Sequence, residues 1–360
     1  AMADGTVTTV KLAADIDIDA TLKVDRTVTL DLNGHVLKYE SENNGSVIVV
    51  EGGGQLTIED SNTSNLSHRF NPNGKLWVLD EASGTETVTG GVITGGTGTD
   101  ISTSGRTTWY CGGGALIKNG GSLTMRGGNI IGCSAECGGG VCIDSEQGQF
   151  SMSGGSIAGC VASDIGGGVF ASGTFKMSGQ AVIRSCTAES ATQFVCGGGV
   201  YVNLSSSFVM SNEAKIEGCQ AISNSSRSKG GGVHLSNNTT LTLSGSAVIQ
   251  NCTATNSANS GEAYGGGVSA ACVKEITLAD SAHIVGCAAA NGSGLYITGS
   301  TTPGYGILYA NSGSVDGDVV LGDTEDGPGT ITGSGGTVFN GKVTVTPGST
   351  IESGTFNGEV

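Results

Sequence analysis

Two acidic residues, Glu136 and Asp164, occupy the same place in successive copies of an internal repeat, two residues before a glycine triplet. If each copy forms one turn of a solenoid, their backbones lie about 5 Å apart, the spacing of paired strands. Carboxyl groups separated by about 5 to 5.5 Å are typical of a retaining glycosidase. Trp109 and Tyr110, in the preceding copy, could form a platform for a sugar ring. Neighbouring carboxylates also arise by chance in the loops of an acidic protein, so both interpretations stay open.

A second candidate is the column of side chains two residues after each glycine triplet. Strand alternation predicts that this column faces solvent on the first strand of each copy. Rings stacked at that spacing could take up a sugar or an apolar partner, or they could simply stabilise the sheet exterior. The column reads Leu116, Cys142, Phe170, Tyr201, His234, Ser269 and Tyr296. The predicted ligand-binding residues are Trp109, Tyr110, Phe170, Tyr201 and His234.

Cysteines form two further columns, one closing each copy and a shorter one just before the glycines. Both are typical of small side chains stacked at a tight corner. Stacked parallel Cβ vectors fit the disulfide dihedral poorly, so we expect mostly free thiols. An odd total of 11 leaves at least one cysteine unpaired within the chain. The first ladder is Cys133, Cys160, Cys186, Cys219, Cys252 and Cys287, and the second is Cys111, Cys137 and Cys196.

No metal or cofactor site is predicted from the sequence. His35, His68, His234 and His283 are scattered, and none belongs to a CxxC or HExxH motif. The acidic run DGDVVLGDTEDG, residues 316–327, could hold calcium but lacks the repeated GGxGxDxUx pattern, which favours a solvated turn. The sequence also lacks a P-loop and a Rossmann fingerprint.

The elements that must position these residues come from six copies of one pattern, such as GGGVYVNLSSSFVMSNEAKIEGC at residues 197–219. The glycine triplets begin at residues 112, 138, 166, 197, 230 and 265. Each copy holds three short alternating segments bounded by Gly, Ser or Asn, which favours three strands per copy. The glycine density and the missing 3.6-residue stripe exclude helices. We therefore predict an all-β fold, a right-handed parallel β-helix of about ten to twelve rungs with three strands each.

Strand alternation also predicts the core. The second strand should point Leu, Met and Phe inward, and the third strand should add one isoleucine per rung. Length varies almost only before the glycine triplet, so one corner is expected to carry variable loops. The inward residues are Leu123, Met125, Phe150, Met152, Phe175, Met177, Phe208, Met210, Leu241, Leu243, Ile130, Ile157, Ile183, Ile216, Ile249 and Ile284.

We expect a single domain. Residues 1–61 form N-terminal capping rungs, 62–111 a rung with long inserts, 112–292 the regular repeats, and 293–360 degraded C-terminal rungs. The insert from Asn62 to Thr89 is expected to overhang the end that carries Trp109. The first residues, AMADGT, lack the basic start and apolar stretch of a signal peptide, and we expect a piece of a longer protein.

The LDLNGH segment, the GGxI rungs and the repeated GGGVY…FxMSG…IxxC pattern resemble right-handed parallel β-helices of the pectate-lyase-like kind. Among these, the chain looks most like the repeat regions of bacterial cell-surface adhesin-like proteins. The repeats cover roughly residues 90–300. The resemblance implies secretion and a location on the cell surface, and it carries over no catalytic motif.

Composition narrows the function classes. With 32 acidic and 16 basic residues, the net charge of −16 argues against nucleic acid and anionic membrane surfaces as partners. No run of 18 apolar residues is present, so no membrane insertion is expected. The favoured function is a non-catalytic, adhesin-like binding module for glycans or host surface proteins. The alternatives are a glycan-cleaving hydrolase or lyase of the same fold and a passive stalk.

Overall fold

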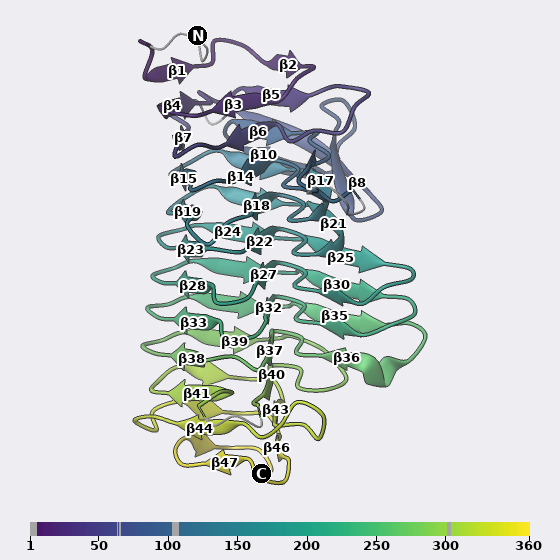
Figure 1. Cartoon of the computed structure of the whole chain (residues 1–360), viewed down its shortest axis with the longest axis vertical. Coiled ribbons are helices and arrows are strands. Elements are labelled where there is room, and N and C mark those ends of the chain that lie inside the picture. Colours follow the sequence, from purple (N-terminus) through teal and green to yellow (C-terminus); the bar gives the residue numbers. More distant parts are fainter. Residues whose placement is uncertain (1–5, 63, 65, 103–107, 301–303) are drawn as a thin grey trace.

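The computed structural model describes residues 6–62, 64, 66–102, 108–300 and 304–360. The chain winds into a right-handed parallel β-helix whose three faces hold 11, 12 and 12 strands, which confirms the predicted fold (Figure 1). A fourth, 10-stranded sheet and a small antiparallel sheet lie outside this helix. In the rungs that start with a glycine triplet, the chain visits face 1, face 2 and face 3 in turn.

The strands of each sheet follow in chain order. Face 1 consists of β3 (Leu22–Val24), β6 (Ile48–Val50), β14 (Ala115–Ile117), β18 (Val141–Ile143), β22 (Val169–Ala171), β27 (Val200–Val202), β32 (Val233–Leu235), β37 (Val268–Ala271), β40 (Leu295–Thr298), β43 (Val319–Leu321) and β46 (Val343–Val345). Face 2 consists of β1 (Thr9–Lys11), β4 (Thr27–Asp31), β7 (Gln55–Glu59), β15 (Ser122–Met125), β19 (Gln149–Met152), β23 (Thr174–Met177), β28 (Ser207–Met210), β33 (Thr240–Leu243), β38 (Glu275–Leu278), β41 (Ile307–Ala310), β44 (Thr330–Thr332) and β47 (Thr350–Ile351). Face 3 consists of β2 (Ile16–Ile18), β5 (Val36–Tyr39), β11 (Val92–Thr94), β16 (Asn129–Ile131), β20 (Ser156–Ala158), β24 (Val182–Arg184), β29 (Lys215–Glu217), β34 (Val248–Gln250), β39 (His283–Val285), β42 (Ser314–Val315), β45 (Val338–Phe339) and β48 (Thr355–Phe356).

The corner between face 3 and face 1 differs from the expectation. The segments of variable length form a sheet rather than loops, and we call it the side sheet. Most of its strands pair in parallel with the same segment of the next rung, so length variation is confined to the turns within each segment. It consists of β12 (Thr99–Asp100), β13 (Tyr110–Cys111), β17 (Ser134–Cys137), β21 (Val161–Ile165), β25 (Thr187–Ser190), β26 (Val195–Cys196), β30 (Gln220–Ser223), β31 (Ser228–Lys229), β35 (Thr253–Asn256) and β36 (Ala263–Tyr264).

The predicted inward residues form the core of the helix. All sixteen are buried, with relative exposures of 1% or less. Because the register does not slip between rungs, like side chains lie over like. The rings of Phe150, Phe175 and Phe208 are parallel, with successive centroids 5.0 and 4.6 Å apart. These ladders continue the burial of apolar surface from rung to rung, which is the main source of stability in such a solenoid.

At the corner where the chain enters face 1, each glycine of the triplet is required for a different steric reason. In one copy the first glycine, Gly197, has a φ of 67°, which side chains rarely adopt. A Cβ on Gly198 would lie 2.3 Å from the carbonyl carbon of Gln220. A Cβ on Gly199 would lie 2.7 Å from the carbonyl oxygen of Gly232 in the next rung. The triplet is therefore required by backbone packing.

Candidate functional site

The side sheet covers the column that was expected to face solvent. Phe170 is 2% exposed and His234 is 5% exposed, so the predicted solvent-facing orientation is wrong for both rings. The column does point out of the helix, but there it meets the inner surface of the side sheet. A second apolar core results, made of Val49, Cys111, Leu116, Cys137, Cys142, Ile165, Phe170 and Cys196. Trp109 and Tyr201 pack against this core and stay partly exposed.

Neighbouring rings of the column lie against one another, with Phe170 and Tyr201 stacked and His234 tilted by 33° against Tyr201. Tyr201 lies 5.5 Å from Phe170 and 5.4 Å from His234 between ring centroids, and Trp109 meets Phe170 edge-on at 6.1 Å. The Nδ1 atom of His234 is buried and has no hydrogen-bond partner. Burial, with a smaller effect from Lys229, lowers the pKa of His234 to about 3. His234 is therefore a neutral ring within a stack.

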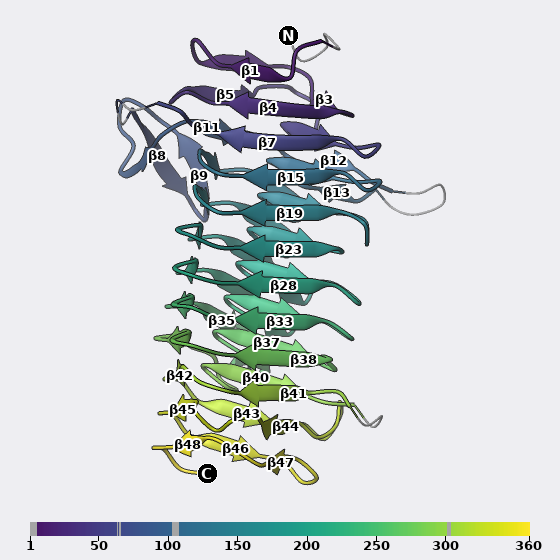
Figure 2. The same cartoon turned by 90° about the vertical axis from the view of Figure 1, so that its left-hand side faces the viewer.

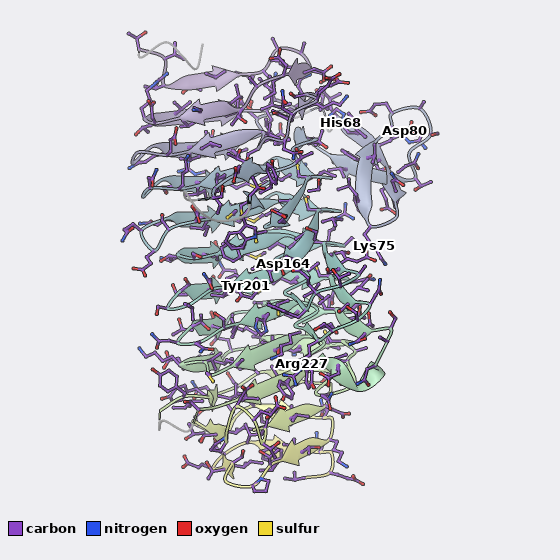
Figure 3. All side chains as sticks on the ribbon, turned by 45° about the vertical axis from the view of Figure 1, so that its right-hand side comes forward. His68, Lys75, Asp80, Asp164, Tyr201 and Arg227 are labelled. Carbon is purple, nitrogen blue, oxygen red and sulfur yellow. The ribbon has the colours of Figure 1, made fainter. Side chains whose placement is uncertain are left out.

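The two candidate catalytic carboxylates are brought to adjacent strands of the side sheet. Glu136 lies on β17 where the register against β21 shifts, and its Oε2 accepts a hydrogen bond of 2.6 Å from the N–H of Tyr110. Asp164 lies on β21, and its Oδ1 is buried without a hydrogen-bond partner. Burial, the charge of Glu136 and the thiol of Cys111 together raise the pKa of Asp164 to about 6. Asp164, labelled in Figure 3, therefore has a side chain whose charge changes near neutral pH according to its raised pKa.

All eleven cysteines are free thiols, and nine of them are fully buried. The long ladder donates weak hydrogen bonds to backbone carbonyls, for example from the Sγ of Cys160 to the oxygen of Ala158 at 3.5 Å. Cys111, Cys137 and Cys142 lie together in the second core. Burial raises the pKa of Cys137 and Cys142. Within the described ranges, no three His, Cys, Asp or Glu side chains are grouped so that they could hold a metal ion.

The insertion after residue 62 forms an antiparallel sheet of β8 (Ser67–Asn73), β9 (Leu76–Leu79) and β10 (Glu86–Thr89). In Figure 2 it lies on the opposite side from β12 and β13, so it does not overhang Trp109 as expected. Trp77 packs on Gly159, where a Cβ would clash with its ring, and the guanidinium of Arg184 lies 4.8 Å from the ring centroid. Lys75 donates to the amide oxygen of Gln220 at 2.7 Å. Together these contacts hold the insertion against several rungs of the β-helix.

The lower end of the side sheet in Figure 1, which is the end nearest the C-terminus, carries a surface that was not predicted from the sequence. An apolar groove of about 300 Å³ lies between β35 and β36 and the segment that follows Cys287. A more polar cavity of about 260 Å³ adjoins it and includes Tyr264, Asn291, Tyr296 and Asp323. The only sequence signal was the short segment AAAN before Gly292, where the preceding copy has a far longer one. The groove is lined by Thr253, Ala254, Thr255, Asn256, Ala263, Ala288, Ala289 and Ala290.

A scan against protein-family models, a search of curated proteins and a search of solved structures each find no match for this chain. Among the described residues, no helix is long and apolar enough to cross a membrane.

Proposed function

We propose that this protein is a surface-exposed, adhesin-like binding module of a bacterium, that it recognises glycans or host surface proteins, and that it performs no chemistry. The observation that carries the proposal is the side sheet. The three faces of the β-helix keep their register from rung to rung. Only the corner between face 3 and face 1 carries an additional sheet, which is built from the segments that vary in length between repeats. Solenoids bind along such extended surfaces, because each rung adds one more local copy of the same surface.

Surface chemistry along the side sheet supports this function. Trp109 and Tyr110 keep partly exposed rings at its upper end, and Tyr264 does so at its lower end. At the lower end Asn291 and Asp323 line the same cavity as Tyr264. A ring beside amide and carboxylate groups is suited to sugar hydroxyls and to polar peptides alike. Of the predicted binding residues, Phe170 and His234 would support this surface from beneath.

The test is an array of glycans and extracellular proteins probed with the purified chain, followed by product analysis on every ligand that binds. Binding without turnover is expected, with a weaker signal for Trp109→Ala or Tyr264→Ala and an unchanged signal for Lys176→Ala on face 2. Turnover of a bound glycan would contradict the non-catalytic function. A silent array would favour the passive stalk.

A catalytic function has one specific observation in its favour. Asp164, with a pKa of about 6, lies beside the carboxylate of Glu136, and a proton donor next to a carboxylate is the arrangement that glycosidases use. If the array reveals turnover, Asp164→Asn and Glu136→Gln should each abolish it. Persistence of turnover in both variants would remove this pair as the catalytic site.

A further inference from the structure

The side sheet ends at β35 without a strand below it. In three successive rungs the chain runs out along one strand and returns along another: β25 and β26, β30 and β31, then β35 and β36. The next rung has only residues 288–291 at this corner. They cross directly from a bridge between Ala288 and Thr253 to a bridge between Asn291 and Tyr264. The outer part of β35 therefore has no neighbour on its lower edge, where the side sheet narrows below β36 (Figure 1).

Backbone groups on this edge are unpaired. The N–H of Thr253 and the N–H of Ser257 bond to the previous rung, and the N–H of Ala254 donates to Ala288 at 2.9 Å. By the alternation of a parallel strand, the carbonyl of Ala254 and both backbone groups of Asn256 face the lower edge. Within the described part of the chain these three groups have no backbone partner. An edge of this kind is a template for an added strand.

The side chains along this edge indicate which residue type an added strand should have at one of its positions. Ser190, Ser223 and Asn256 stand in one column. Ser223 donates to the carbonyl of Gln193 at 2.9 Å, and Asn256 donates to the carbonyl of Ser226. Ser223 pairs with Ser190 of the rung above and donates to the residue three positions after Ser190. Asn256 likewise pairs with Ser223 and donates to the residue three positions after Ser223. The next member of the column would be a Ser or Asn that donates to the second lone pair of the Asn259 carbonyl, which also accepts from the N–H of Glu262 at 3.0 Å.

The groove itself restricts the size and charge of an occupant. Its floor is made of alanines, including Ala254 and Ala263, so it is shallow and accepts an extended backbone with small side chains. Glu262, which directly precedes the groove residue Ala263, and Glu325 share Arg227 at 2.8 and 3.2 Å; Arg227 is labelled in Figure 3. These three side chains carry a net charge of −1, which favours a basic flanking residue.

We propose that the groove below β35 binds an extended, basic peptide segment of a protein partner as an added strand of the side sheet. The first residue of this strand donates its N–H to Ala254 and accepts from the N–H of Asn256. The second residue, Ser or Asn, points inward to the carbonyl of Asn259, and the third donates its N–H to the carbonyl of Asn256. This proposal rests on the proposed function and specifies one class of partner for it.

The probe is a fluorescein-labelled Lys-Thr-Ser-Thr-Lys amide, followed by fluorescence anisotropy. A contact with only a few hydrogen bonds should bind saturably with a Kd of about 0.1 to 1 mM. N-methylation of either threonine removes an N–H that faces β35 and should weaken binding about tenfold or more. N-methylation of the serine, whose N–H faces away, should change binding less than about twofold.

Protein variants complete the test. Ala290 is an exposed residue that lines the groove, and Ala290→Phe should abolish peptide binding by filling it. Ala82→Phe makes the same change at an exposed alanine in the turn between β9 and β10 and should leave binding intact. The proposal would be overturned if the peptide showed no saturable binding or if its binding survived Ala290→Phe. It would also be overturned if N-methylation of a threonine and of the serine weakened binding to the same extent. If the array described above still gives ligands while the peptide does not bind, the strand site fails and the binding function stands.

Discussion

The ring of Phe170 lies parallel to the ring of Tyr201 in the next rung, with the centroids 5.5 Å apart and the planes 6° from parallel. Phe170 is 2% exposed because the side sheet packs over it. A ligand could reach its face only if the side sheet moved away. The stack therefore joins two sheets, and its first contribution is to stability.

Replacing Phe170 by alanine should lower the free energy of unfolding by about 3 to 4 kcal/mol, because a large buried ring leaves a cavity. Urea denaturation followed by circular dichroism measures this loss. Trp109→Ala, at a partly exposed ring, should cost less. Equal stability of Phe170→Ala and the parent would mean that the side sheet does not pack as described.

Gly198→Ala should destabilise the protein by about 2 to 3 kcal/mol, since the new Cβ would overlap the backbone of Gln220. Gly52→Ala is the control for backbone strain without crowding, because Gly52 has a φ of 62°, a conformation that Gly198 does not share, and has no atom within 4 Å of the added Cβ. The control should cost only about 1 kcal/mol, from backbone conformation alone. The two midpoints of urea unfolding give the comparison, and similar losses would show that crowding at the triplet is unimportant.

His234 should make the protein sensitive to acid. Its pKa is about 3 in the folded chain and near the usual 6.5 in the unfolded chain, so the unfolded state takes up a proton first as the pH falls. Its contribution to stability is present above pH 6.5 and is lost as the pH falls toward 3. Between pH 6.5 and about pH 5 the loss is about 2 kcal/mol.

The measurement is urea unfolding of the parent and of His234→Phe at a series of pH values. The variant keeps a ring in the stack and has no titrating group there. It should therefore lose less stability than the parent over this window. Identical pH profiles would show that His234 titrates normally.

Asp164 should have the opposite pH dependence. Its pKa is raised from 3.8 to about 6, so the folded state holds the proton more tightly, and stability falls as the pH rises through this window. Asp164→Asn should therefore stabilise the protein at pH 7 by about 1 kcal/mol, after discounting for its partial exposure to solvent. The gain should vanish below about pH 3, where the Asp164 carboxyl is protonated in both the folded and the unfolded chain. A gain that is independent of pH would contradict the raised pKa.

Much of the helix could be predicted from the chain itself. Alternation with a period of two determines which side of each strand faces the core, and so Phe175 and Ile183 were placed correctly inside. The glycine triplets marked the corners because only glycine tolerates that backbone. Both signals are local, and a repeat displays them six times over.

Whether the outward-pointing column of side chains is buried or exposed was decided by the tertiary structure. Alternation shows that Phe170 points away from the core, but it does not show what lies on that side. The answer depends on the segments before the glycine triplets, which vary in length and carry little periodicity, yet pair in register with their neighbours to form the side sheet. The same pairing creates the open edge at β35, because strand addition depends on which neighbour is present in space. A sequence specifies the direction of a side chain locally, whereas its burial depends on contacts between distant segments.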